Sequence, residues 1–306
     1  MKRYLAISLL ALALASCKSD TNELPNNQPV LLLGYQAFNG TSSEQIALDY
    51  DADNRITRVS RLTPSQPPVT IYDISYAGNE ITLTRPFTNN DSITLQESIV
   101  LTVDGDKLVK RVERSFFEFK APTSLPQRSY IYDSIGYTYS GELRESAGGV
   151  HYDSTWFNPG TEQILRDTQY ITHSFVNNGG NLSSSNRLIQ YVSTKEESGN
   201  TVVTKRSLEE AMTYGYSSSY LNKTDFLNQV ILQELNVFNF GLINSAYTNI
   251  PDQLSTSLTD RDELGNVIST SSATYNRVIS YNAEGYLETI TDAANPQIKT
   301  TYFYNR

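Results

Sequence analysis

The chain has 306 residues, a formal net charge of −9, and 21 tyrosines beside many threonines, serines and asparagines. An acidic chain repels phosphate groups, which argues against nucleic-acid binding and against direct attraction to anionic lipid headgroups. Tyrosine and threonine suit half-buried strands, while asparagine, glycine and aspartate suit turns. The composition therefore predicts an antiparallel β protein with many hairpins.

The N-terminus has the layout of a lipoprotein export signal. A basic pair at positions 2 and 3 precedes an apolar stretch, Tyr4 to Leu14, and two small residues precede Cys17, the only cysteine. Eleven apolar residues make about 16 Å of helix, too short for a hydrocarbon core of about 30 Å. We therefore predict a signal peptide over residues 1–16 and acyl chains on Cys17 that anchor the protein in the membrane.

A tether is expected between this lipid and the folded domain. Residues 17–29 are polar after Cys17 and include two prolines, which is typical of a flexible linker. The acidic residues Asp20 and Glu23 resemble export signals that carry some Bacteroidota lipoproteins to the outer face. We predict an outer-membrane lipoprotein of the cell envelope, displayed at the surface rather than in the periplasm. The alternative is an ordinary secreted protein with a chance cysteine.

A turn motif recurs in residues 30–306, which we expect to form one β-rich, repeat-like domain. Two clear copies are YDADNRITRV, from Tyr50, and YNAEGYLETI, from Tyr281. In each, an aromatic residue precedes an Asp or Asn turn, and Asn54 or Gly285 can take the positive φ that closes a short hairpin. Weaker copies begin at Tyr76, Val103 and Asp262.

The aliphatic residues after these turns have an unusual spacing. Ile56 and Val59 are three apart, and so are Leu287 and Ile290. An odd offset places two side chains on opposite faces of a flat strand. Either these strands are covered on both faces, or a β-bulge follows the turn.

The Tyr-turn-Gly-x-Leu units resemble the YD repeats of RHS-type proteins. The chain is more closely similar to a family of Bacteroidota outer-membrane lipoproteins in which a lipobox precedes YD-like hairpins and a final Tyr-Asn-Ala-Asp-Gly-Tyr hairpin. The matching stretches here are 214–220, 225–243 and 249–290, with Thr224-Asp225-Phe226 in place of that family's Asn-Pro-Phe element. The resemblance implies a β-rich envelope lipoprotein and implies no activity.

Two segments predict helices. Ser207 to Glu210 has the form of a capping box that would start a short helix through Met212. Phe226 to Phe240 carries apolar residues at helical spacing, although an edge strand over 230–232 is a rival interpretation. Such a helix would cover an open face of the sheet. The sharper hypothesis is a lid over an apolar cavity, whose ligand would contact Phe226, Leu235 and Phe238.

These elements predict a mainly β fold, an antiparallel meander of short hairpins with one or two short helices. The meander would form a curved sheet, a sandwich or an open barrel. We find no zinc-binding or nucleophile-elbow motif and no phosphate loop, and His151 and His173 both lie on alternating segments. The Asp51 turn offers too few oxygens for calcium. We expect no enzyme activity, no metal and no cofactor.

One aromatic cluster suggests a binding surface. Trp156 is the only tryptophan, and Tyr152 precedes it on the same segment. They could form a platform for a sugar ring, although core packing is the more ordinary explanation. Four further tyrosines lie near in sequence, Tyr130, Tyr132, Tyr137 and Tyr139.

Three classes of function follow. We favour a non-catalytic binding or scaffold lipoprotein, which predicts exposed aromatic clusters on one rim and a glycan or envelope protein as partner. An envelope carrier of a lipid or other apolar ligand predicts a cavity lined by the helix. A hydrolase predicts a cleft with two converging carboxylates of unequal pKa.

Overall fold

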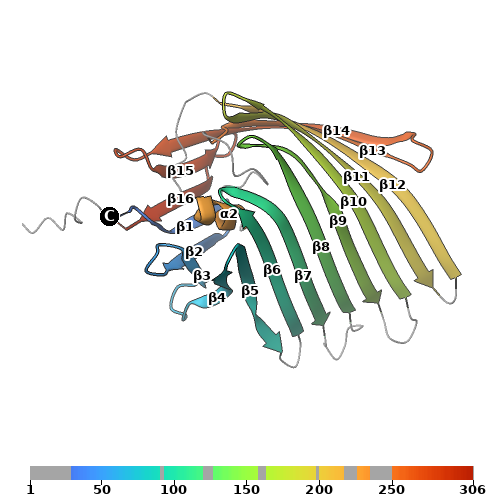
Figure 1. The fold of residues 1–306 in the computed structure, drawn as a ribbon, viewed down its shortest axis with the longest axis horizontal. Helices are drawn as coiled ribbons and strands as arrows, with labels where there is room; N and C mark the ends of the chain where they lie inside the picture. Colours follow the sequence, from blue (N-terminus) through green and yellow to red (C-terminus); the bar gives the residue numbers. More distant parts are fainter. Residues whose placement is uncertain are drawn as a thin grey trace, which may run out of the picture.

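The computed structural model describes residues 29–89, 93–119, 127–157, 163–197, 200–216, 226–234 and 250–305. Almost all of these residues lie in strands, labelled in Figure 1. The strands are β1 (Leu32–Asn39), β2 (Ser43–Tyr50), β3 (Ile56–Leu62), β4 (Val69–Ala77), β5 (Glu80–Asn89), β6 (Ile93–Asp104), β7 (Lys107–Phe119), β8 (Gln127–Ser140), β9 (Leu143–Phe157), β10 (Gln163–Asn178), β11 (Asn181–Glu197), β12 (Asn200–Gly215), β13 (Gln253–Arg261), β14 (Val267–Tyr281), β15 (Leu287–Asp292) and β16 (Ile298–Tyr304). The helix is α2 (Phe226–Glu234).

The strands form a closed antiparallel barrel. Each strand pairs with its neighbours in sequence, and β1 pairs with β16 to close the ring. The predicted antiparallel meander is thus confirmed, and among the architectures expected from the sequence it is a barrel, closed rather than open. Strands β8 to β12 are much longer than β1 to β5 and project beyond them as a curved sheet (Figure 1).

We call the end of the barrel that holds the short turns before β3, β5, β7, β9, β11 and β15 the turn end, and the opposite end the far end. Three of the turns predicted from the sequence share one hydrogen-bond pattern. In the first copy, the Asp51 carboxylate accepts bonds from the N–H groups of Asp53 and Arg55, at 2.9 Å each. Asp262 and Asn282 make the same two bonds in their own turns. The Asp side chain therefore caps the turn, as the motif predicts.

A bulge after these turns resolves the odd spacing of the aliphatic residues. Tyr50 pairs with Ile56 while the preceding residue, Asp49, pairs with Arg58, so Thr57 is skipped. Ile56 and Val59 consequently face the same way and are 0% and 1% exposed. The turn before β15 repeats this arrangement, with Glu288 skipped and both Leu287 and Ile290 buried. The bulge alternative is confirmed.

Tyrosine hydroxyls at the turn end explain the aromatic residue of the motif. Tyr76 donates to the carbonyl of Ile56 at 2.8 Å, and Tyr139 donates to the carbonyl of Leu108 at 2.9 Å. Each accepting residue directly precedes a bulged residue, where the ladder is interrupted. The hydroxyl supplies that carbonyl with a partner. The same bond joins Tyr50 to Leu32, Tyr216 to Leu182 and Tyr304 to Leu287.

Removing one such hydroxyl is expected to destabilise the barrel. Tyr76→Phe deletes the bond to a buried carbonyl and should lower the free energy of unfolding by about 1 to 3 kcal/mol. Tyr170→Phe, at a side chain that is 51% exposed, is the control and should change it by less than about 0.5 kcal/mol. Urea denaturation of both variants measures the difference. Equal losses would show that the Tyr76 hydroxyl contributes nothing specific.

The hydrophobic core fills the inside of the barrel toward the turn end and includes α2. Val230, Ile231 and Leu232 are 1%, 0% and 0% exposed and belong to one cluster with the strand residues. The Asn228 side chain accepts a hydrogen bond from the N–H of Ile56 and donates one to the carbonyl of Asn54. These two bonds attach α2 to the turn between β2 and β3. The helix therefore packs against the inner wall, which agrees with the covering role.

The wall of the shorter strands carries polar side chains on its outer surface. One outward row across β2 to β6 contains Asp49, Arg58, Asp73, Thr84 and Ser98. Neighbouring inward residues on the same strands are buried and apolar. The alternation in this row is polar-out and apolar-in, the reverse of that in barrels embedded in a bilayer.

One of the two helix predictions needs correction. Residues 207–212 belong to β12 and not to a helix. Leu208 and Met212 both face inward in an alternation of period two, and β12 pairs with β11 on one side and with β13 on the other. The second predicted helix is present over Phe226–Glu234, and the rest of the predicted segment, with Leu235 and Phe238, lies outside the described residues. In the part of the chain that the structure describes, no helix is long and apolar enough to cross a membrane.

Candidate binding face

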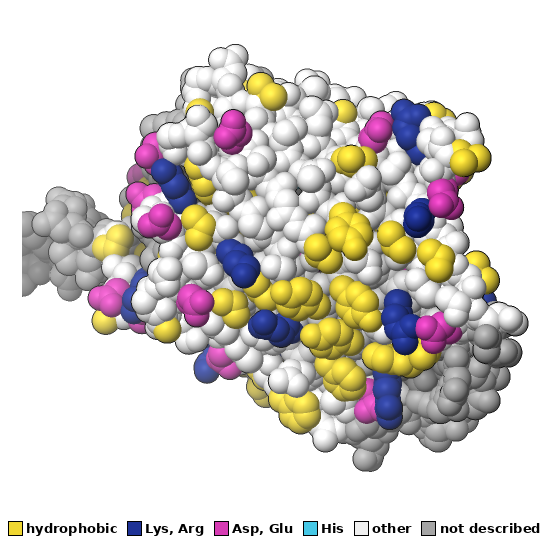
Figure 2. Space-filling view, turned by 45° about the vertical axis from the view of Figure 1, so that its right-hand side comes forward, with side chains coloured by type: hydrophobic (Ala, Val, Ile, Leu, Met, Phe, Trp, Pro, Cys, Tyr) yellow, Lys and Arg dark blue, Asp and Glu magenta, His cyan; other side chains and the backbone are white. Residues whose placement is uncertain are grey.

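Six aromatic side chains gather on the outer surface of the long strands. The register places Phe116 opposite Tyr130, and Tyr132 opposite Tyr152, all on the outward face. Tyr130, Trp156 and Tyr170 are 36%, 38% and 51% exposed. Figure 2 shows apolar side chains gathered over this part of the molecule, beside several Lys and Arg side chains. We call this surface the aromatic face: Phe116, Tyr130, Tyr132, Tyr152, Trp156 and Tyr170.

The aromatic face exists because the apolar side of the strands changes along their length. Near the turn end of β8, the inward residues Ile135 and Tyr137 are buried. Toward the far end of the same strand, Tyr130 and Tyr132 are outward, while the inward residue opposite Ile131 on β9 is Asp153. Along this one strand, the large aromatic side chains thus change from the inner face to the outer face. On the outer face they contribute little to the stability of the fold.

Charged groups border the aromatic face. The Arg114 guanidinium lies 5.7 Å from the centre of the Tyr132 ring, a cation–π arrangement. Arg128 pairs with Glu118 at 2.6 Å, and Arg166 pairs with Glu196. An apolar centre with a charged rim is the composition of a contact surface. Aliphatic side chains complete the outward rows: Val112, Val150, Ile164, Val192 and Val203.

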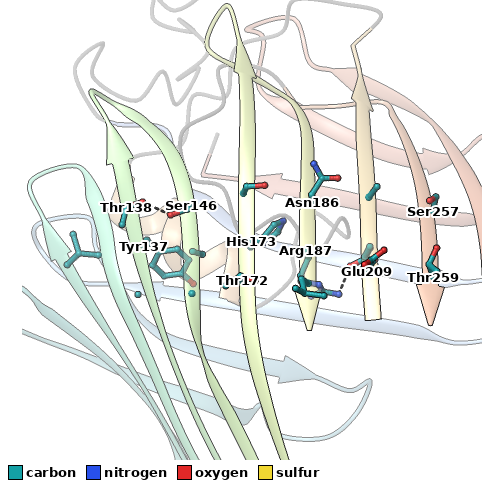
Figure 3. A pocket seen from close by; sticks show the side chains of 18 residues that line it. Tyr137, Thr138, Ser146, Thr172, His173, Asn186, Arg187, Glu209, Ser257 and Thr259 are labelled. Carbon is teal, nitrogen blue, oxygen red and sulfur yellow. Dashed lines mark hydrogen bonds and ion pairs between the residues drawn. The ribbon is translucent and has the colours of Figure 1, made fainter. Parts of the chain in front are cut away.

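A trough of about 890 Å³ crosses the outer surface between the aromatic face and the turn end. Its floor is formed where Gly136 and Gly148 sit opposite each other on β8 and β9. The hydroxyls of Thr138 and Ser146 are 2.6 Å apart at one end. Figure 3 shows the lining side chains on successive strands, where the hydroxyl and amide groups of Thr172, Asn186, Ser257 and Thr259 lie among apolar and charged side chains that include Tyr137, Arg187 and Glu209.

The two histidines occupy the inner side of the barrel wall. His151 lies 3.8 Å from Asp133, which raises the pKa of the imidazole by hydrogen bonding. His173 stacks on Phe175 at 4.2 Å, and burial lowers its pKa to about 4. They stand on different inward rows, four positions apart, so they do not converge. Within the described ranges, no group of three metal-ligating side chains is found.

The outcome for the predicted contact residues is mixed. Trp156 and Tyr152 do share the aromatic face, with Tyr130 and Tyr132 beside them. Tyr137 and Tyr139 point inward instead, because the odd-numbered positions of β8 face the core. The sequence analysis did not identify Phe116 and Tyr170 as members of this surface. Extending the alternation of inward and outward residues along β7 and β10 would have identified them.

The structure does not describe the side chains of the other predicted positions. Phe226 begins α2, whose described apolar side chains are in the core. Cys17, the predicted lipidation site, lies outside the described residues, as do Leu235 and Phe238.

Comparison with known proteins adds one structural likeness. No family model matches the chain, and no curated protein matches it. The structure is similar to the crystal structure of a porin-like protein from Bacteroides vulgatus ATCC 8482, with 13% identity, a TM-score of 0.45, and coverage of 90% of this chain and 99% of that chain.

Proposed function

We propose that this protein is a non-catalytic binding protein of the cell envelope, anchored through acyl chains on Cys17, and that the aromatic face holds its partner. The observation that carries the proposal is the cluster of exposed Tyr130, Trp156 and Tyr170 on a rigid antiparallel sheet. This is the exposed aromatic cluster that the binding hypothesis required. A fixed sheet presents such groups at little conformational cost.

The composition of the aromatic face favours a protein partner. Tyrosine, tryptophan and arginine are the residues that dominate contact energy at protein interfaces. Here Trp156 and Tyr130 occupy adjacent outward rows, and Arg114 and Arg128 lie at the edge. The partner we expect is an envelope protein that offers apolar side chains with acidic groups around them.

The position of the aromatic face relative to the anchor supports the same proposal. The described chain enters the barrel at the turn end, where the Leu32 carbonyl accepts a bond from Tyr50. The aromatic face lies toward the far end, beside Phe119 and Phe157. The predicted tether would therefore join the barrel at the end opposite the aromatic face.

Loss of the aromatic side chains should abolish partner binding. We expect the protein extracted from its own membrane in mild detergent to carry a partner of fixed stoichiometry, measured by native mass spectrometry. The double variant Tyr130→Ser/Trp156→Ser should lose that partner, because truncating two central aromatic contacts costs about 2 kcal/mol or more each. The acyl mass on Cys17 is read in the same spectra.

The matched control is Phe303→Ser, since Phe303 is 40% exposed on β16, away from the aromatic face. This variant should retain the partner. Retention by the double variant, or a wild-type protein with no bound species, would contradict the proposed function. An unacylated Cys17 would contradict the anchoring alone.

A glycan is the second candidate ligand, and the trough supports it. Hydroxyl and amide side chains line a volume that suits several sugar units, and Tyr170 lies one outward row away for stacking. Calorimetric titration with envelope polysaccharides would show heat for the wild type. Asn186→Ala and Tyr170→Ala should each reduce it.

The carrier alternative also fits a closed barrel. We place it behind the binding role because the described apolar side chains of α2 pack in the core, whereas the trough is on the outer surface and is not lined by α2. The absence of enzyme activity stays part of the proposal and is tested by the same ligands, which should be recovered unchanged.

A further inference from the structure

The β14 strand has an open edge. Residues 267–276 pair with β13, but β15 pairs only with Arg277 to Tyr281. The β13–β14 hairpin therefore extends past β15 (Figure 1). Among the described residues, no other strand pairs with this stretch. Nine of its ten residues are exposed, so the stretch is uncovered on both faces as well.

The direction of the backbone groups on this edge follows from strand geometry. The carbonyl of Asn276 accepts from the N–H of Ala293, on the β15 side. The N–H of Arg277 points the other way, to the carbonyl of Asp252. Because backbone groups alternate between the two neighbours, Thr270, Ser272 and Thr274 direct their N–H and C=O groups to the open edge.

Natural open edges are usually blocked by charges, prolines or bulges. The sequence from Val267 to Asn276 is VISTSSATYN, with no charge and no proline. The only irregularity in its pairing with β13 is at the start, beside Val267. This edge is therefore regular, uncharged and free of the features that prevent strand addition.

We propose that the β14 edge pairs antiparallel with the same edge of a second copy of this chain. Two copies of a chain with net charge −9 repel each other, so self-association needs an uncharged strip, and this one provides it. A two-fold axis at Ser272 places Thr270 of one copy opposite Thr274 of the other. The residues whose backbone groups point to the open edge then lie opposite each other. All the paired residues are neutral, so the strip is complementary to itself.

Disulfide trapping tests this register. Ser272→Cys, in the chain from Lys18 onward, which keeps every described element, brings two thiols together at the axis, within the Cα separation that a disulfide accepts. Mild oxidation should convert most of the protein to a covalent dimer. Ser257→Cys is the matched control, because Ser257 is the outward neighbour of Ser272 on β13 but does not reach the edge. It should remain monomeric.

A second variant separates pairing from chance collision. Ser272→Pro removes the edge-directed N–H without charge, and sedimentation velocity should show a monomer where the wild type shows a dimer. Circular dichroism checks that the variant keeps its strands. A monomeric wild type at 100 µM, equal cross-linking of both cysteine variants, or a partner chain of another sequence on the edge would overturn the proposal. The aromatic face is not involved, so failure here leaves the proposed function untouched.

Discussion

Arg111→Met is expected to lower the free energy of unfolding by about 3 to 5 kcal/mol, because it leaves buried carboxylates without their partner. The guanidinium contacts Glu234 of α2 at 2.7 Å, Glu113 at 2.7 Å and Asp133 at 3.1 Å. Burial alone would lower the pKa of Arg111, but Glu234 and Glu113 raise it. Urea denaturation followed by tyrosine fluorescence measures the loss.

Arg114→Met provides the matched control on the same strand. Arg114 is exposed on the outer surface, where a charge contributes little to stability, so the change should be within about 0.5 kcal/mol. The double variant Arg111→Met/Glu234→Leu should recover part of the loss, since it removes the most buried of the stranded carboxylates. An Arg111 variant as stable as the Arg114 variant would show that α2 is held without this cluster.

Acidification from pH 6.5 to pH 4 is expected to lower the free energy of unfolding by about 3 kcal/mol through His173 alone. Each unit of pKa shift changes that free energy by about 1.4 kcal/mol. Burial lowers the pKa of His173 from 6.5 to about 4. The folded protein thus disfavours the protonated ring. The stability that His173 contributes is complete above pH 6.5 and is lost as the pH falls through this window.

The variant His173→Leu separates the contribution of His173 to stability from that of the carboxylates, which also titrate in acid. The difference in unfolding free energy between wild type and variant should change by about 3 kcal/mol from pH 7.5 to pH 4. His151→Gln is the control of opposite sign, because Asp133 raises the pKa of His151. The stability from His151 is present below pH 6.5 and lost as the pH rises through its folded pKa. Parallel pH profiles for wild type and His173→Leu would refute the burial argument.

Local chemistry made the turns and bulges predictable. The Asp51 turn, the positive φ of Asn54 and the bulge between Ile56 and Val59 all depend on residues within ten positions of one another. The capping box at Ser207 failed for the opposite reason. Its local preference for a helix was outweighed by ladders to β11 and β13, which the sequence around Ser207 does not contain.

The binding face was only half predictable. Trp156 and Tyr152 lie close in sequence, so their alternation places them on one face of β9. The contribution of Tyr170 depends on the β9–β10 register, in which it pairs with Val150. Closure of the barrel likewise depends on β1 meeting β16, a contact between the two ends of the domain. Local sequence patterns do not predict how separate strands pair with each other.

The meander has a consequence for how the barrel assembles. Every hydrogen-bonded pairing between the described strands joins neighbours in sequence, except the one between β1 and β16. The sheet can therefore grow one hairpin at a time, and each addition closes only a short loop except the connection from β12 to β13, which spans residues 216–252 and includes α2. The last step joins the seam, where the N–H of Asn305 donates to the carbonyl of Leu31 and the Asn305 side chain accepts from the N–H of Leu31. That single seam closes a row of local hairpins into a ring.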